Sequence, residues 1–293
     1  GICGLSLALN LKQRGIEARV YERAPEIKPL GVGITLLPHA MREFTALGLG
    51  DELLAAGIEN RESRFYNRFG QLIYKEPRGK FAGYQFPEVG IHRGNLHVML
   101  YEAVRKKLGP DAVVTDCEAQ SVEQDETGAT ISFNQTSTGK PRDSVRADVV
   151  IACDGINSAI RKQFVANDKI AFAGINTWRG VTRRKPINGG RTYMRVGSIN
   201  TGKMVIYPIV DNIDSDGNQL INWMAEIKRD TVEQNDWNKP GDLNDFFSIY
   251  EDWRFDWLDV AQMIRDADQI LEYPMVDKDP ISPIRFYKIS FDI

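Results

Sequence analysis

Two glycines and one acidic residue near the start of the sequence have the types and spacing of a phosphate- and sugar-binding turn. Gly1 and Gly4 precede a stretch of helical spacing, and Glu22 closes a short alternating stretch. Glycine lets the backbone approach a pyrophosphate, and a helix N-terminus offers unpaired N–H groups and a positive dipole end. A carboxylate after the next strand accepts hydrogen bonds from a ribose. The order favours a dinucleotide site over a plain surface turn, without distinguishing NAD from FAD.

A second glycine motif follows the apolar stretch "ADVVIAC". Asp154 and Gly155 come directly after this predicted strand, and Ser158 and Arg161 follow on the next predicted helix. An aspartate there can anchor a phosphate region, and an arginine can meet a phosphate or an incoming nicotinamide nucleotide. The alternative is an ordinary turn with an acidic cap before a helix.

Both motifs need strands and helices around them, and the patterns supply these. A helix is expected after Gly4 and ends near Gly15, and another follows Pro38 and breaks near Gly48. Hairpins are expected within 62–77 and 111–133, and a helix within 89–109. Long strands without intervening helices indicate an antiparallel sheet over 172–224, and residues 236–268 are expected to be helical and rich in aromatics.

Composition excludes several classes of function. The chain of 293 residues has a net charge of −3, so no basic excess points to nucleic acid, and no apolar stretch approaches the length of a membrane span. Cys3, Cys117 and Cys153 show no metal-like spacing and indicate reduced thiols in a cytoplasmic protein. No metal site is expected, and His39, His92 and His97 have no partners at catalytic spacing.

Taken together, the motifs resemble the FAD-dependent aromatic hydroxylases, the flavoprotein monooxygenases of the para-hydroxybenzoate hydroxylase fold. The resemblance runs from Gly1 to about Asp279. It is carried by the stretches "GICGLSLAL", "VYERA", "GVGITLLPHAMREFTALGLGDEL", "IHRGNLHVML" and "ADVVIACDGINSAIR". The stretches "WRGVT", "DWNKPGDL", "DWRFDWLDV" and "EYPMVDKDP" are similar to the subgroup that contains the methylphenazine-carboxylate monooxygenase.

The resemblance implies an α/β fold: a Rossmann-like FAD-binding domain interleaved with an antiparallel-sheet substrate domain. The expected segments are 1–61 and 91–168 for FAD binding, 62–90 for a substrate-domain hairpin, and 169–293 for the substrate domain and C-terminal end. The cofactor-binding residues that it implies are Gly1, Gly4, Glu22, Arg23, Arg93, Asp154, Gly155 and Arg161. No individual catalytic residue is assigned. The glycines at 31 and 33 resemble a segment near FAD.

The implied reaction uses FAD, with NADH or NADPH as reductant, dioxygen and a small aromatic substrate. The subgroup resemblance implies a phenazine-like substrate. In this family a flavin C4a-hydroperoxide hydroxylates the ring, so no catalytic triad or metal is required. Trp178, Tyr207, Trp223, Trp253 and Trp257 are expected to be core residues more often than substrate contacts. For Arg179 a cross-strand salt bridge is favoured over a role as the partner of a substrate carboxylate.

The sequence also departs from the family pattern at both ends. The strand and first glycine that precede this turn in the family are absent, and "ISPIRFYKISFDI" stands where the family has a Gly–Asp–Ala–Ala–His motif. A chain truncated in this way is expected to bind FAD weakly and to hydroxylate little. A non-catalytic remnant is therefore the main alternative. A flavin-dependent reductase or halogenase and a simple NAD dehydrogenase are less favoured.

Overall fold

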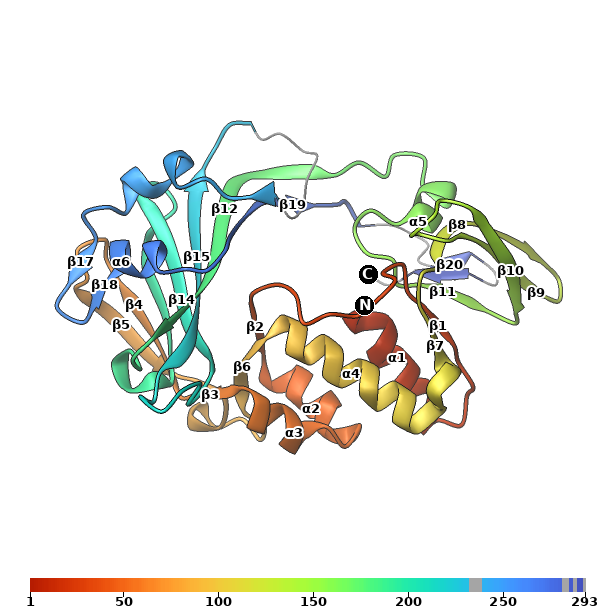
Figure 1. Ribbon diagram of the computed structural model, residues 1–293, viewed down its shortest axis with the longest axis horizontal. Helices are drawn as coiled ribbons and strands as arrows, with labels where there is room; N and C mark the ends of the chain where they lie inside the picture. The colour runs from red at the N-terminus through yellow and green to blue at the C-terminus, as the bar shows by residue number, and fades with distance from the viewer. Residues whose placement is uncertain (232–238, 281–284, 287–288, 292–293) are drawn as a thin grey trace. The chain divides into compact units, whose positions relative to one another are not determined.

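The computed structural model describes residues 1–231, 239–280, 285–286 and 289–291 of the chain (Figure 1). These residues form two compact units. The first unit contains Gly1–Pro29, Leu96–Ala171 and the described part of Asp277–Ile293. The second unit contains Leu30–Asn95 and Phe172–Val276. The mixed α/β architecture with antiparallel sheets confirms the predicted fold class.

The two units divide the chain at other places than the segments expected from the sequence. The expected boundaries followed residues 61, 90 and 168, whereas residues from Leu30 onward belong to the second unit. The reason is strand pairing. Strands β2 (Gly33–Leu36) and β3 (Ile58–Asn60) both pair antiparallel with β6 (Glu88–His92), and β6 contacts a strand of the large sheet. The functional labels of the four segments stay predictions.

The first unit combines helices with short parallel pairs and a hairpin sheet. Its helices are α1 (Ile2–Gln13), most of α4 (Arg93–Leu108), α5 (Ala159–Phe164) and the short η2 (Pro110–Ala112). Two pairs of strands are parallel: β1 (Val20–Tyr21) with β7 (Val113–Val114), and β11 (Val150–Ala152) with β21 (Ile289–Phe291). Strand β21 also pairs antiparallel with β20 (Arg285–Phe286). Its antiparallel sheet contains β8 (Glu118–Asp125), β9 (Gly128–Asn134) and β10 (Pro141–Ala147).

Local sequence signals explain these elements. Gly15 follows α1 with a φ of +75°, a left-handed conformation that glycine adopts without strain. The β8–β9 hairpin turns at Asp125, whose Oδ1 accepts from the backbone of Thr127 and Gly128. Buried apolar side chains then join α5 to the strands: Val122, Ala129, Val150, Ala152, Ile160 and Ile289. The predicted helix that ends near Gly15 is confirmed, but it begins at Ile2 and not after Gly4, so Gly4 lies in its first turn. The hairpin and the strand–turn–helix unit are confirmed.

The second unit is built on one sheet of eight strands, in the order β16-β19-β12-β15-β14-β13-β4-β5. These strands are β4 (Glu62–Tyr66), β5 (Leu72–Pro77), β12 (Ala171–Arg184), β13 (Thr192–Ser198), β14 (Gly202–Val210), β15 (Gln219–Lys228), β16 (Lys239–Pro240) and β19 (Ile270–Asp277). The hairpin expected within 62–77 is β4–β5, and β12, β15, β14 and β13 pair antiparallel as predicted. The pair β13–β4 is parallel.

Helices α2 (Pro38–Ala46) and α3 (Gly50–Ala56) belong to the same unit and pack against each other. Pro38 stands at the first turn of α2, where its missing N–H has no cost. Gly48 lies between the helices with a φ of +77°. The helix after Pro38 and its break near Gly48 are therefore confirmed.

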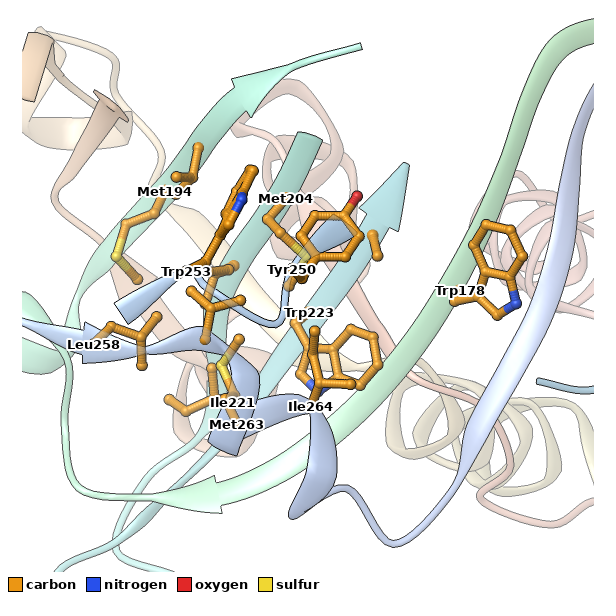
Figure 2. Packing of buried hydrophobic residues seen from close by; sticks show 14 of the residues in the cluster. Trp178, Met194, Met204, Ile221, Trp223, Tyr250, Trp253, Leu258, Met263 and Ile264 are labelled. Atoms are coloured by element: carbon orange, nitrogen blue, oxygen red, sulfur yellow. The ribbon is translucent and has the colours of Figure 1, made fainter. Parts of the chain in front are cut away.

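The eight-stranded sheet has two faces with different coverings. On β12, Trp178 and Thr182 point to one face, which we call the core face. Arg179 and Val181 point to the other face, where Val205, Tyr207 and Ile209 of β14 are also buried. The core face carries Met194, Met204, Ile221 and Trp223, packed against Tyr250, Trp253 and Leu258 of the following segment (Figure 2). Trp178 and Trp223 are almost fully buried.

The prediction of a helical segment over 236–268 was wrong for most of that range. Residues 236–238 lie outside the described part of the chain. The rest contains short 3₁₀ turns, η4 (Leu243–Asp245) and η5 (Phe247–Ile249), a small hairpin of β17 (Arg254–Phe255) and β18 (Leu258–Asp259), and one helix, α6 (Val260–Arg265). The side chains of Phe246, Tyr250 and Trp253 insert into the core face from these turns. Their spacing in the sequence is also that of one face of a helix, which is why the pattern predicted a helix. Two further 3₁₀ turns are η1 (Gly79–Ala82) and η3 (Asn188–Gly190).

Candidate FAD site

The glycine turn in the first unit leaves the N-terminus of α1 open. Gly1 is the N-cap of α1, and no side chain caps the helix there. A Cβ placed on Gly1 would meet no atom within 4 Å. The first N–H groups of a helix have no partner within the helix, and the space beside the Gly1 Cα is open. This arrangement fits a pyrophosphate, whose oxygens would take the place of the absent cap.

Glu22, directly after β1, lies beside this turn. Its Oε2 accepts from the nitrogen of Gly1 at 2.7 Å, and its Oε1 accepts from the backbone N–H of Ala24 at 3.0 Å. Burial raises the pKa of Glu22, but the hydrogen bonds that its carboxylate accepts outweigh burial and lower it overall. The carboxylate is thus ionised at neutral pH and suited to accept the hydroxyl groups of a sugar.

Gly4, in the first glycine motif, lies close to the residue that precedes the second glycine motif. A Cβ at Gly4 would lie 3.5 Å from the Cβ of Cys153 and 3.9 Å from Cγ1 of Val20. Cys153 immediately precedes Asp154, so the second motif lies next to the start of α1. Both distances are ordinary van der Waals contacts. The approach of α1 to the strands therefore leaves room for an alanine at Gly4.

The second motif forms a turn that caps α5. Gly155 has a φ of +78°, and a Cβ there would meet nothing within 4 Å. Ser158 is the N-cap, and its Oγ accepts from the backbone N–H of Arg161 at 2.8 Å. Oδ2 of Asp154 accepts from Ile160 N–H at 3.5 Å, a long contact. The Asp154 carboxylate consequently keeps capacity for a further partner.

Arg161 takes part in a buried ion cluster. Its Nε lies 2.7 Å from Oδ1 of Asp168, and its Nη2 donates to the backbone oxygen of Asp279 at 3.1 Å. The other oxygen of Asp168 binds the Nζ of Lys278. The side chain of Asp168 is 3% exposed and that of Lys278 is 6% exposed. No sequence pattern indicated Asp168 or Lys278, because the three residues meet only through the fold.

Arg23 has an exposed side chain. Its guanidinium lies 4.0 Å from Glu118, and its backbone oxygen accepts from Oγ1 of Thr136 at 2.7 Å. The backbone is therefore fixed next to Glu22 while the charged end stays in solvent. Such a side chain can reach an adenosine or its phosphate without breaking a strong contact.

Arg93 belongs to the second unit and lies beside the other glycine-rich stretch. Its backbone N–H donates to Val32 at 2.9 Å, and its Nη1 lies 3.9 Å from the position that a Cβ of Gly31 would occupy. Gly31 has a φ of +106°. Gly33 donates its N–H to Oδ1 of Asn222 at 2.7 Å. Among the described residues Arg93 forms no ion pair, so its charge is available to an anionic ligand.

A cavity of about 330 Å³ in the second unit does not involve these residues. It is lined by Arg183, Arg184, Lys185, Pro186, Ile187, Trp257, Leu258 and Asp266. Its cations already have partners: Arg183 pairs with Asp214, Arg184 with Asp266, and Lys185 donates to the backbone oxygen of Asp216. We therefore assign no ligand to this cavity.

Comparison with known proteins decides the family. The FAD binding domain family matches residues 1–239. The phenazine 1,6-dicarboxylic acid hydroxylase of Lysobacter antibioticus is 37% identical over 286 residues, covering 96% of this chain and 70% of that protein. The chain belongs to the FAD-binding aromatic hydroxylases. The predicted family and its cofactor, FAD, are confirmed.

Other members of the FAD-binding aromatic hydroxylases match over shorter stretches or with lower identity. The 3-hydroxybenzoate 6-hydroxylase of Polaromonas naphthalenivorans is 32% identical over 188 residues, which cover 63% of this chain and 45% of that protein. Klebsiella pneumoniae HpxO, solved with FAD and uric acid, has a TM-score of 0.78 at 20% identity, covering 99% of this chain and 70% of that one. The HpxO likeness supports the fold alone.

Two further findings bear on the kind of site. Within the described ranges, no helix is long and apolar enough to cross a lipid bilayer. The same residues contain no group of three or more His, Cys, Asp or Glu side chains that could hold a metal ion.

Proposed function

We propose that this protein is an FAD-dependent monooxygenase that hydroxylates an aromatic substrate, with NADH or NADPH as reductant and dioxygen as the oxygen source. The observation that carries the proposal is the 37% identity over 96% of the chain to a phenazine dicarboxylic acid hydroxylase. The substrate class proposed from this relative is an aromatic ring system of phenazine type.

In this proposal, different residues described above bind different parts of FAD. The N-terminus of α1, with Gly1 and Gly4, binds the pyrophosphate, and Glu22 accepts the hydroxyl groups of the adenosine ribose. Arg23 lies at the adenosine end of this site in the first unit. Arg93, in the second unit, is proposed as a cofactor-binding residue from the family resemblance alone.

The second glycine motif has a supporting part in this proposal. Asp154 and Gly155 approach the phosphate region, because the turn is open and the carboxylate has spare hydrogen-bond capacity. For Arg161 we propose a positioning part, since Asp168 and the backbone of Asp279 hold its guanidinium and thereby fix α5.

The chemistry that FAD supplies when bound is the passage of electrons from the nicotinamide nucleotide to dioxygen and of one oxygen atom to the ring. The protein's residues bind, orient and shield. Helix N-H groups neutralise phosphate charge, Glu22 fixes the sugar, and the apolar sheet face in the second unit excludes water from an aromatic ring. No acid–base residue is required from the protein by this proposal.

The test is titration of the purified chain with FAD, followed by quenching of flavin fluorescence. We expect saturable binding of one FAD per chain, and Glu22→Gln is expected to weaken it roughly tenfold because one charged acceptor is lost. Glu26→Gln is the matched control, since Glu26 is an exposed carboxylate paired only with Lys28. Substrate-dependent NADH or NADPH oxidation with a product heavier by one oxygen atom then tests the hydroxylation itself.

Absence of saturable FAD binding would contradict the proposal. Equal weakening by Glu22→Gln and Glu26→Gln would remove Glu22 from the site while leaving the function. FAD binding without substrate-dependent oxygen transfer would instead favour the alternative expected from the sequence, a non-catalytic relative.

A further inference from the structure

Asn222 is a buried polar residue on the face of the large sheet opposite to the core face. It lies on β15 and is 3% exposed. Strand register places it between Val181 of β12 and Tyr207 of β14, and Tyr207 belongs to a buried apolar cluster with Val205 and Ile209. An amide among apolar side chains is costly unless its polar atoms are hydrogen-bonded. The partner of Asn222 therefore explains why an amide stands at this position.

The partner of Asn222 is the backbone of the glycine-rich stretch Gly31–Gly33. Oδ1 of Asn222 accepts from the N–H of Gly33 at 2.7 Å, and the two residues are 189 positions apart in the sequence. Gly33 is the first residue of β2, and β15 lies in the middle of the eight-stranded sheet. The hydrogen bond thus joins the start of a small sheet to the centre of the large one.

Other polar side chains on this face have partners within the large sheet. Glu226 is bound to Nζ of Lys203 at 2.8 Å. The guanidinium of Arg179 lies 4.5 Å from the ring centre of Tyr273. Within the described part of the chain no carboxylate pairs with Arg179, so the expected cross-strand salt bridge does not form. Asn222 differs from these residues because its bond leads out of the large sheet.

The close approach at Gly33 requires a glycine. A Cβ there would lie 2.8 Å from Cβ and Cγ of Asn222 and 2.8 Å from Cγ2 of Ile209, closer than non-bonded carbon atoms lie in proteins. Gly90 of β6 meets β14 in the same way, since its Cβ would lie 2.5 Å from the backbone oxygen of Pro208. Because β2 and β6 are paired, the two glycines let the small sheet lie directly on the large one.

This contact holds the loop before β2 and the residue that follows β6. The backbone oxygen of Val32 accepts from the N–H of Arg93 at 2.9 Å, and Nη1 of Arg93 lies 3.9 Å from the Cβ position of Gly31. Gly31 and Arg93 are both exposed. Since Val32 is bonded covalently to Gly33 and through its carbonyl to Arg93, a displacement of Gly33 moves the exposed loop and the arginine together.

We propose that Asn222 is a positioning residue for FAD: its amide oxygen holds Gly33 and thereby fixes the Gly31–Gly33 stretch and Arg93 in the arrangement that binds the cofactor. The inference rests on the proposed function, in which Arg93 is a cofactor-binding residue. Asn222 acts through Gly33 and is not itself a contact of FAD. Without this hydrogen bond only a fraction of the chains has the stretch in place, and the apparent affinity falls by that fraction.

The experiment compares variants of the full chain by titration with FAD, followed by flavin fluorescence and by the absorption spectrum of the bound flavin. Asn222→Leu removes the acceptor at similar size and is expected to weaken FAD binding roughly tenfold. Asn222→Asp keeps an oxygen acceptor at the same place and is expected to stay within about threefold of the wild-type affinity and to keep its spectrum. This rescue assigns the effect to the hydrogen bond and not to side-chain volume.

Asn176→Leu is the matched control. Asn176 is also buried, at 4% exposed, but it lies on the core face of β12, where its Nδ2 donates to Glu272 at 2.7 Å. Both leucine variants are expected to lose stability in urea unfolding, because each removes one partner of a buried hydrogen bond. Only Asn222→Leu is expected to lose affinity for FAD.

Three results would overturn the inference. They are wild-type affinity in Asn222→Leu, equal losses in Asn222→Leu and Asn222→Asp, and a loss in Asn176→Leu as large as that in Asn222→Leu. The last result would show that general stability, and not the position of Gly33, governs the affinity.

Should Asn222→Leu fail to fold, hydrogen exchange of the wild-type chain without FAD still decides. The amide of Gly33 is expected to exchange at least roughly tenfold more slowly than the same amide in an unstructured peptide of residues 30–36. Equal rates would overturn the inference, because the stretch would not be held before the cofactor binds.

FAD binding by the wild-type chain separates this inference from the proposed function. A wild-type chain that binds FAD no better than Asn222→Leu keeps the function and loses the inference. A wild-type chain that binds no FAD overturns both.

Discussion

Glu22 shows how a single residue combines several weak signals. The sequence placed it at the end of a short strand after a glycine turn, and the structure gives its two oxygens donors from Gly1 and Ala24. Gly1, Gly155 and Glu22 could be predicted because glycine turns and strand-end acids are local features. The partners of Arg161 and Arg179 could not, since Asp168, Lys278 and Tyr273 reach them only through long-range packing.

The lowered pKa of Glu22 predicts how its contribution to stability depends on pH. Because the folded pKa lies below the ordinary 4.5, the unfolded chain takes up the proton first as the pH falls. The stability that ionised Glu22 contributes is therefore present above about pH 4.5 and lost as the pH falls through the folded value. Glu22→Gln should cost about 1–3 kcal/mol at pH 7 and much less at pH 3. Urea unfolding of both proteins at several pH values measures this, and a pH-independent difference would contradict it.

At the scale of elements, the alternation of strands is what the sequence made readable. The hairpin at 62–77 and the antiparallel strands over 172–224 follow from period-two patterns and turn residues. The segment after residue 238 could not be read in this way. Its aromatic spacing resembles a helix, but the rings fill the core face one by one from turns. Their positions are set by the space between the strands.

Thr182 connects three elements and gives a prediction at this scale. Its buried Oγ1 accepts from Nε1 of Trp223 on β15 at 3.0 Å and donates to the backbone oxygen of Met263 in α6 at 2.8 Å. Thr182→Val keeps the shape but leaves both groups buried and unpaired, so we expect a loss of about 2–4 kcal/mol. Thr182→Ser keeps the hydroxyl and should lose about 1 kcal/mol. Urea unfolding followed by tryptophan fluorescence makes the comparison, and equal losses in the two variants would refute the account.

At the scale of the whole molecule, the chain crosses from one unit to the other after Pro29, Asn95, Ala171 and Val276. The expected boundary after residue 168 lies close to the crossing at Ala171, because the pattern changes there from helix to long strands. The crossing near Leu30 was missed because β2 and β3 are short and their partner, β6, lies far along the chain. At Asp277 the chain passes back into the first unit, and no change of composition in the sequence marks this point.

The buried cluster of Arg161, Asp168 and Lys278 lies next to two of these crossings in the sequence. Asp168→Asn would leave two cations buried together, so we expect a loss of about 3–5 kcal/mol in the first unit. Limited proteolysis should then cut faster near residues 165–171 and 277–280. Glu102→Gln, which removes an exposed pair with Arg105 in the same unit, should leave the cutting rate unchanged. Equal rates for wild type and Asp168→Asn would show that the cluster does not hold these segments.

Trp178 and Arg179 are sequence neighbours whose side chains serve opposite sides of β12. Exchanges at every second position along this strand can consequently alter one face of the sheet while the hydrophobic interior on the other face stays intact. Descendants of one ancestor could diversify their chemistry by this route without refolding, and an insertion of a single residue would abolish both properties together.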